Sequence, residues 1–321
     1  MTRIPANETG VTLAALVRAV EPDWSWNRCR EAIAAGRVSV AGEVVLDQAR
    51  RFPAGTEVVI AAHGRRPPPA LPSIQVYFHD AHLIVVEKPS GIESVPFETR
   101  KSESKSNAGH EATLIDLARR WLEIKERHKL PPLRVVHRID KGTSGILVFA
   151  RTPAAEKGLG RQFRDHSISR KYLAICAGLV KSRTIKSRLI DDRGDGYRGS
   201  TTHRDLGKPA VTHVECLATT PSTGYSLVAC RLETGRTHQI RIHLCESGHP
   251  LCGDTVYRRP VRGDADLPDP SRSPRLALHA AELGFVHPVS NAALHFASPF
   301  PDDLRRLWQT LGGAPLVESG T

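Results

Sequence analysis

The sequence lacks the segments that would place this protein in a membrane or send it out of the cell. Residues 1–8 contain no apolar stretch of the kind found in secretory signal peptides. Apolar runs such as residues 83–86 and 146–150 are far too short to cross a bilayer. We therefore expect a cytoplasmic protein with no membrane partner.

Motifs for disulfides, metals and nucleotide cofactors are missing as well. The six cysteines never form CxxC, which indicates buried thiols rather than a disulfide framework. Three histidines and two cysteines lie between His238 and Cys252, but their spacing fits neither a zinc ribbon nor HExxH. A zinc nucleobase deaminase would need HxE and PCxxC, and neither is complete. There is no Walker loop, GxSxG elbow or dinucleotide fingerprint either, and we expect no metal at this cluster.

Positive charge, by contrast, is in excess. The chain has 45 Lys+Arg against 34 Asp+Glu, a formal net charge of +11 at pH 7. This balance favours a polyanionic partner, either nucleic acid or an acidic membrane surface, although a generally basic proteome would produce the same excess.

A proline-rich stretch at residues 64–73 divides the chain, because prolines at this density continue neither a helix nor a central strand. We predict a first domain at 1–63, a linker at 64–73, a large domain at 74–313 and a tail at 314–321. The first domain is expected to contain a helix at 26–35, closed by Gly36, and strands at 37–40, 43–46 and 56–60. Three arginines near one end of that helix form a candidate phosphate-binding face, unless they merely coat a solvated flank: Arg28, Arg30 and Arg37.

In the large domain, predicted strands outnumber helices and often follow one another directly. That pattern indicates an α+β fold with a mainly antiparallel sheet. Helices are expected from Thr113 to about Arg127 and from Thr152 onward. The polar residues 101–110 predict a mobile loop. Strands are expected at 74–78, 83–87, 146–150, 171–177, 210–217, 225–232, 239–244, 282–286 and 293–297.

Two segments are densest in side chains that could do chemistry. In residues 135–150, a charged turn with Asp140 lies between two strands, and an aspartate flanked by cations could act as a nucleophile or a base. An Asx-turn or a surface ion pair explains the local pattern at least as well. In residues 232–244, a strand would put Gln239, Arg241 and His243 on one face, which suits either a substrate cleft or a solvated face.

Five short blocks, taken in order, resemble the RluA-type pseudouridine synthases. HRIDKGTSG at 137–145 is similar to the family's HRLD-x-x-TSG signature, and GRTHQIR at 235–241 matches its GRTHQ-[LI]-R block. The other three are EKPSG at 87–91, RKYLA at 170–174, and RLALHA at 275–280 with His287-Pro288 after it. Five blocks in the family's order make chance agreement negligible. More loosely, residues 29–43 resemble the ribosomal protein S4-like RNA-binding domain.

The resemblance implies an α+β enzyme with a mainly antiparallel mixed sheet and a small N-terminal S4-like α/β domain. Its activity would be the isomerisation of uridine to pseudouridine in structured RNA, without a cofactor. We expect large-subunit rRNA as the substrate and a monomeric enzyme. A tRNA uridine isomerase and a non-catalytic RNA-binding protein remain the alternatives.

The resemblance also implies roles for individual residues. Asp140 would be the nucleophile, attacking either the ribose anomeric carbon or carbon 6 of the base, with Arg241 as its cationic partner. The other implied site residues would contact the base or the RNA: Tyr172 against the uracil ring, Leu278 beside it, Arg138 in the space left by the flipped uridine, and Arg236. Two positions depart mildly from the family pattern, Ile139 for Leu and Glu87 for Asp. After Gly91 the chain diverges, which bears on substrate choice.

Overall fold

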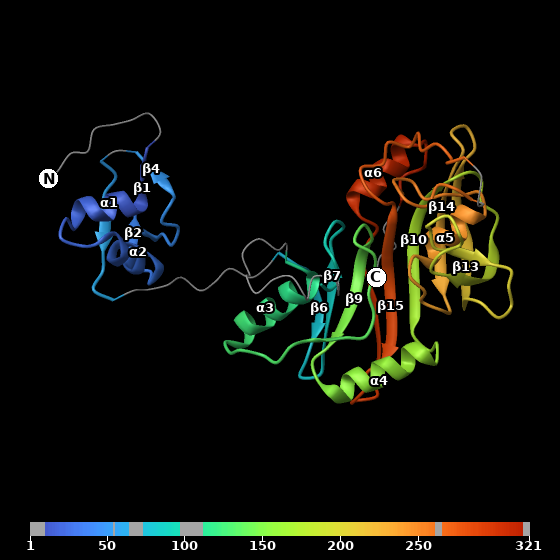
Figure 1. Ribbon diagram of the computed structural model, residues 1–321, viewed down its shortest axis with the longest axis horizontal. Coiled ribbons are helices and arrows are strands. Elements are labelled where there is room, and N and C mark those ends of the chain that lie inside the picture. Colours follow the sequence, from blue (N-terminus) through green and yellow to red (C-terminus); the bar gives the residue numbers. More distant parts are fainter. Residues whose placement is uncertain (1–9, 54, 64–72, 97–111, 261–264, 317–321) are drawn as a thin grey trace. The chain divides into compact units, whose positions relative to one another are not determined.

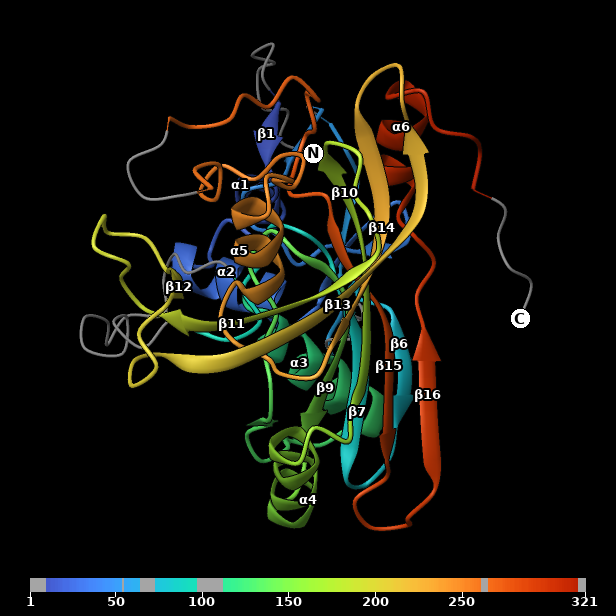
Figure 2. The same ribbon diagram turned by 90° about the vertical axis from the view of Figure 1, so that its right-hand side faces the viewer.

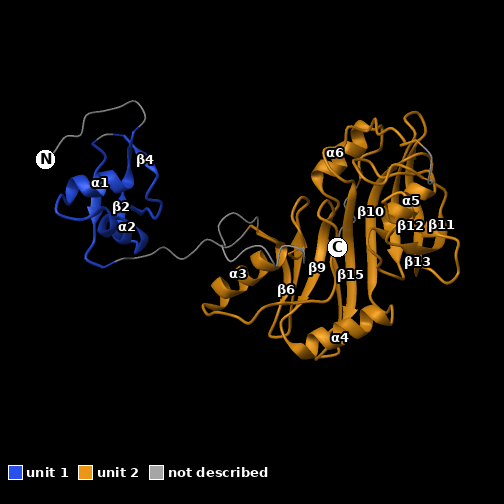
Figure 3. Ribbon diagram, viewed as in Figure 1, with its two compact units in different colours: residues 1–70 blue, residues 71–321 orange. Residues whose placement is uncertain are grey.

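A computed structural model describes residues 10–53, 55–63, 73–96, 112–260 and 265–316. Within it the chain divides into two units, residues 1–70 and 71–321 (Figure 3). Of the predicted linker only Ser73 is described, and the predicted loop 101–110 lies outside the described residues.

The first unit packs two helices against short strands. Its three-stranded sheet has the order β3-β2-β5, and β1 pairs with β4. The sequence predicted α2 but not α1, and β3 is shorter than the predicted strand. The side chain of Ser25 caps α2 by accepting a hydrogen bond from the Arg28 amide at 3.2 Å, and Gly36 follows the helix at a φ of +71°. The elements are β1 (Val11–Thr12), α1 (Leu13–Val20), α2 (Trp26–Ala34), β2 (Val38–Val40), β3 (Glu43–Val44), β4 (Arg51–Phe52) and β5 (Val58–Ile60).

The second unit is built on an 11-stranded sheet with the order β12-β11-β13-β14-β10-β15-β9-β7-β6, to which β16 and β8 add at β15 and β9 (Figure 1). Only the β15–β9 pair is parallel among the described pairings of this sheet. This confirms the predicted α+β, mainly antiparallel architecture. The strands are β6 (Val76–His79), β7 (Leu83–Lys88), β8 (Arg134–Val135), β9 (Ser144–Ala150), β10 (Ser169–Ala177), β11 (Arg183–Ile190), β12 (Gly199–Thr201), β13 (Lys208–Thr220), β14 (Tyr225–Leu232), β15 (Leu278–Val286) and β16 (Ala293–Ala297).

Helices cover both faces of this sheet, as Figure 2 shows for α3 and α5 on one side and α6 on the other. Alternate residues of β10 follow this division. Ala174 belongs to the apolar cluster that includes α3 and α5, and Ile175 to the cluster of α6. Both helices begin where the sequence predicted. Thr113 forms a capping box with Asp116 at the start of α3, and the Thr152 hydroxyl accepts a hydrogen bond from the Ala155 amide at the start of α4. The helices are α3 (Leu114–Glu126), α4 (Pro153–Arg164), α5 (Gln239–Glu246) and α6 (Asp302–Thr310).

The predicted strand at 239–244 is wrong, because these residues form helix α5. Its polar side chains do not share an exposed strand face; all are buried and bonded to other elements. Gln239 donates to the Val211 carbonyl at 3.0 Å, and His243 pairs with the Thr212 hydroxyl at 2.9 Å. Polar and apolar residues of this segment are both buried, so their alternation does not mark one exposed and one buried face, as it would in a half-buried strand.

The six cysteines are free, and all are buried except the half-buried Cys216. Among the helices that the described ranges contain, none has both the length and the apolar character needed to cross a membrane.

Candidate active site

A pocket of about 850 Å³ lies where the two chemically dense segments of the sequence meet. The six candidate residues of the large domain come from four separate parts of the chain, and all of them line this pocket: Arg138, Asp140, Tyr172, Arg236, Arg241 and Leu278. The sheet therefore brings together residues as far apart as 138 and 278.

Asp140 sits in the turn between β8 and β9. The Thr143 amide donates to the Asp140 carbonyl at 3.0 Å, which closes the turn. The turn leads into Gly145 at a φ of +117°, where β9 pairs with β15. A Cβ at this position would lie 2.2 Å from the Ala280 carbonyl oxygen, so only glycine allows the two strands to approach this closely.

Beneath the turn, the EKPSG segment supports it through a buried lysine. Lys88 is fully buried, and its ammonium donates to the carbonyls of Pro89, Ile92 and Lys141 at 2.8–2.9 Å. Burial lowers the pKa of Lys88 to about 7, although the charge of Asp140 opposes this shift. Lys88 was not among the predicted site residues. The EKPSG block contains Lys88, but the pattern of the block does not show that the Lys88 side chain reaches the Asp140 turn.

Arg241, on α5, is held between two carboxylates. Its Nε and Nη2 donate to the two carboxylate oxygens of Asp254 at 2.7 and 2.8 Å, and its Nη1 donates to Asp140 Oδ2 at 3.3 Å. The Asp254 side chain is completely buried. Burial alone would lower the pKa of Arg241, but hydrogen bonds and charge from Asp254 and Asp140 raise it above its ordinary value. The bidentate pair fixes the plane of the guanidinium and aims its remaining nitrogen at Asp140. Sequence reasoning missed Asp254 entirely.

His238 lies beside Asp140, and Tyr257 contacts His238. His238 Nε2 lies 3.8 Å from Asp140 Oδ1, and its Nδ1 is 2.7 Å from the Tyr257 hydroxyl. The Tyr257 ring also lies 4.8 Å from the Arg241 guanidinium carbon. Burial lowers the pKa of His238, so the imidazole is neutral at pH 7. Of the three side chains His238, Tyr257 and Arg241, only Arg241 therefore presents a charge to Asp140.

Tyr172 and Leu278 form the apolar part of the wall, and both are buried. Tyr172 pairs with Ala280 at a register shift between β10 and β15. Burial raises the pKa of Tyr172 to about 12, so it stays a neutral phenol. A flat, uncharged wall of this kind can accept the face of a planar base.

The remaining candidates of the large domain, Arg138 and Arg236, lie at more open positions. Arg138 is exposed and forms no ion pair with any residue that the structure describes. Arg236 is half-buried, and its Nε donates to the Pro209 carbonyl at 2.9 Å.

In the first unit, the structure brings together two of the three predicted arginines. The guanidinium carbons of Arg28 and Arg37 lie 4.7 and 5.4 Å from the ring of Trp24. Arg30, two residues along α2 from Arg28, instead lines a surface hollow with Asp47 and Gln48.

The histidines and cysteines between His238 and Cys252 do not converge on one point. His243 lies 2.9 Å from the Ser187 hydroxyl, and His249 Nδ1 lies 3.0 Å from the Ala177 carbonyl. Cys245 and Cys252 belong to two different apolar clusters. Within the described ranges, no three His, Cys, Asp or Glu side chains are grouped so that they could hold a metal ion.

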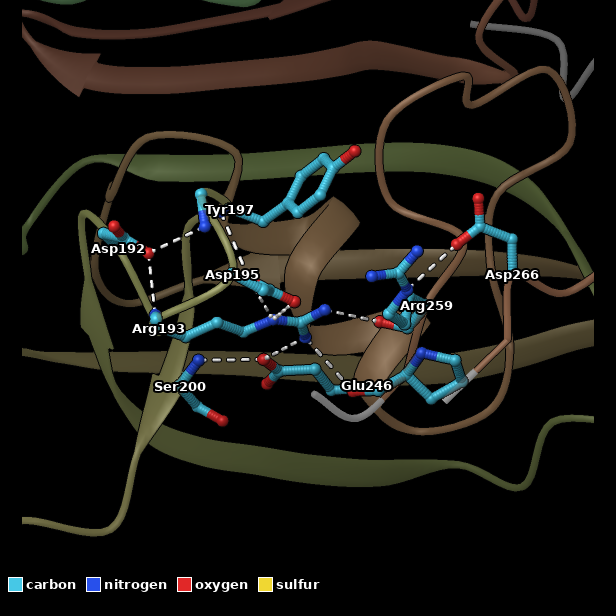
Figure 4. Close-up of polar contacts among 11 residues, drawn as sticks. Asp192, Arg193, Asp195, Tyr197, Ser200, Glu246, Arg259 and Asp266 are labelled. Carbon is cyan, nitrogen blue, oxygen red and sulfur yellow. Dashed lines mark hydrogen bonds and ion pairs between the residues drawn. The ribbon is translucent and has the colours of Figure 1, made fainter. Parts of the chain in front are cut away.

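A polar clamp secures the far end of α5 (Figure 4). Arg193, in the loop after β11, pairs with Asp195 at 3.1 Å and with Glu246, the last residue of α5, at 3.6 Å. Its Nη2 also donates to the Arg259 carbonyl at 3.0 Å, two residues beyond Tyr257. The clamp joins the loop, α5 and the segment after Tyr257, and so restrains the elements that carry Arg241 and Tyr257.

Known proteins share this fold. The structure of human RNA pseudouridylate synthase domain containing 4 aligns with a TM-score of 0.58 at 22% identity, covering 74% of this chain and 93% of that one. Human RNA pseudouridylate synthase domain containing 1 aligns with a TM-score of 0.54 at 22% identity, covering 78% and 99%. The fold is thus that of the pseudouridylate synthases.

Sequence comparison gives the family. Residues 82–246 match the family model described as RNA pseudouridylate synthase. Ribosomal large subunit pseudouridine synthase D of Zymomonas mobilis is 37% identical over 74% of this chain and 73% of its own length. The protein of the same name from Nitrosomonas europaea is 34% identical over 97% of this chain and 88% of its own length. The chain belongs to the RNA pseudouridylate synthase family, and the predicted enzyme class, a pseudouridine synthase, is confirmed.

Proposed function

We propose that this enzyme isomerises uridines in large-subunit rRNA, with Asp140 as the nucleophile. One observation carries the proposal: Arg241, fixed by the buried Asp254, donates to Asp140 inside a pocket walled by Tyr172 and Leu278. The names of the relatives from Zymomonas mobilis and Nitrosomonas europaea favour rRNA as the substrate.

The reaction needs a carboxylate, a fixed cation and a neutral wall. If Asp140 attacks the ribose anomeric carbon, an ester bond forms there and the electrons of the glycosidic bond leave with N1 of the uracil. The uracil turns, its C5 displaces the carboxylate, and the proton on C5 is lost while N1 gains one. In the other route, Asp140 adds to C6 of the base and the C5=C6 electrons move toward O4. The glycosidic bond then breaks, C5 bonds to the anomeric carbon and loses its proton, N1 gains one, and the C6–O bond breaks to release the carboxylate. In both routes Arg241 aims the carboxylate, and Tyr172 supports the ring while it turns.

A uridine inside an RNA helix cannot reach this pocket, so the base must leave the stack. Arg138 is exposed at the pocket and without an ionic partner among the described residues, which suits a side chain that takes the place of the flipped base. Arg236 adds a second cation on the same wall.

The first unit would hold the structured RNA as a separate domain, at 1–63, joined to the catalytic domain at 74–313 by the linker 64–73. Arg28 and Arg37 over Trp24 form its cationic surface. The proposal includes a monomeric enzyme that needs no metal or cofactor.

The test uses the purified enzyme with unmodified transcripts of large-subunit rRNA and, separately, of tRNA. Tritium at C5 of uridine is released when pseudouridine forms, and primer extension after carbodiimide treatment locates the site. Release from rRNA at discrete positions supports the proposal. Release from tRNA alone would replace the substrate, and release from neither RNA would contradict the activity in this form.

A further inference from the structure

The pocket extends from Asp140 to a second wall that no predicted site residue occupies. This wall is one face of helix α4, since its pocket-lining residues recur every three or four positions. They are Pro153, Glu156, Lys157, Gly160, Phe163 and Arg164, and His166 follows the helix.

The charges on this wall are unbalanced. Lys157 and Arg164 are exposed, and neither forms an ion pair with a described residue. Glu156 is already paired, because Arg134 donates to its carboxylate at 2.8 Å. Unpaired cations that face a pocket favour an anionic ligand.

The two glycines of α4, Gly158 and Gly160, differ in how closely the protein packs around them. A Cβ on Gly158 would lie 2.6 Å from Pro288 Cβ, so packing explains that glycine. A Cβ on Gly160 would meet only the end of the Arg164 side chain, at 3.4 Å, which is ordinary contact. Glycine within a helix is destabilising relative to alanine, and packing against the protein gives no reason for it at 160. Gly160 lines the pocket between the two cations, where a missing side chain lets a ligand approach the helix.

The wall is continuous with the catalytic end. Phe163 stacks at 4.7 Å on His137, the residue before Arg138. Phe163 also contacts the buried Arg170, whose guanidinium carbon lies 5.5 Å from the Phe163 ring. Arg170 Nη2 donates to the Glu233 carbonyl at 3.1 Å, at the end of β14. A ligand bound at Asp140 can therefore continue onto α4.

We propose that the α4 wall binds the phosphodiester backbone beside the target uridine, with Lys157 and Arg164 contacting phosphates and Gly160 allowing the strand to approach. The inference rests on the proposed function, because it needs an RNA whose uridine occupies the catalytic end. In this proposal the RNA strand beside the target uridine binds to α4, a helix that contains none of the family blocks described above.

The first test compares Lys157→Gln/Arg164→Gln with Arg161→Gln. Arg161 is exposed on the same helix but does not line the pocket, so it controls for the loss of one cation from α4 outside the pocket. The probe is the tritium-labelled large-subunit rRNA transcript, with its binding measured in parallel by filter retention at several salt concentrations. The double variant should raise KM and Kd about ten-fold or more. It should also reduce the slope of log Kd against log salt by about 1.4, because each phosphate contact on a single strand contributes about 0.7 and two contacts are lost. Arg161→Gln should match the wild type.

The second test compares Gly160→Ala with Gly158→Ala. Gly160→Ala should leave the melting temperature unchanged or raise it, yet raise KM, because the added methyl group obstructs the strand. Gly158→Ala should lower the melting temperature through its clash with Pro288. The inference is overturned if the double variant binds RNA like Arg161→Gln, or if Gly160→Ala leaves KM and Kd unchanged. A wild type that binds the transcript but releases no tritium contradicts the proposed function, and the binding comparison still decides the role of α4.

Discussion

Asp254 should be the residue on which the geometry of Asp140 depends, although it does not touch the substrate itself. Asp254→Asn keeps the shape but replaces one acceptor oxygen with an NH2 group that faces the Arg241 donors. Both partners of the pair are buried, with exposed side-chain fractions of 10% for Arg241 and 0% for Asp254. Removing one partner of a buried pair costs about 3–5 kcal/mol of the free energy of unfolding. In a unit of this size, that corresponds to a fall of roughly 10 °C in the melting temperature.

The same change should reduce turnover, because Arg241 loses the contacts that orient it toward Asp140. A misplaced catalytic group commonly costs on the order of 100-fold in rate. Urea unfolding followed by circular dichroism measures the stability, and single-turnover tritium release measures the chemistry. The control is Glu123→Gln. Glu123 pairs with Arg119 one helical turn away on α3, and this pair is half-exposed. Its loss should lower the free energy of unfolding by about 0.5 kcal/mol and leave turnover unchanged. If Asp254→Asn has the stability and turnover of this control, Asp254 does not hold Arg241 in place for Asp140.

Three further predictions concern pH, RNA binding and metals. The pKa of Lys88 is about 7 in the folded protein and about 10.4 in the unfolded chain. Between these pH values the unfolded chain binds one more proton than the folded protein, so the free energy of unfolding should rise with pH. This rise should be absent in Lys88→Met, and equal pH profiles of stability for the two proteins would contradict the prediction. Arg28→Gln/Arg37→Gln should weaken RNA binding and lower the slope of log Kd against log salt, with a smaller effect on turnover at saturating RNA. An unchanged slope would show that these arginines do not contact the RNA. Treatment with EDTA should leave tritium release unchanged, and a loss that zinc restores would show a metal requirement.

Much of the fold follows from signals that the sequence carries locally. The caps at Thr113 and Thr152 fixed the starts of α3 and α4, and β14 and β16 fall where strands were predicted. Helix α6 was missed, although Asp302 and Asp303 in its first turn and the buried Leu304, Leu307 and Trp308 give it a recognisable pattern. Helix α5 was misassigned because tertiary contacts bury its polar residues, which local periodicity cannot foresee.

The candidate site depends on contacts between distant parts of the chain. The Asp140–Arg241 pair came from the resemblance to a family and not from any local pattern. Asp254 and Tyr257 follow α5 without a motif, and their role becomes visible only where the chain returns to Arg241. The glycine at 160 was likewise unremarkable until its surroundings showed that packing does not require it.

Asp140→Asn shows whether Asp140 is the nucleophile. This change keeps the size of the side chain and removes the carboxylate that forms the covalent bond. The measurement is single-turnover tritium release from the rRNA transcript, with RNA affinity measured on the same preparation. If Asp140 is the nucleophile, we expect no detectable release and an RNA affinity within a few-fold of the wild type. Substantial release by Asp140→Asn would contradict this role.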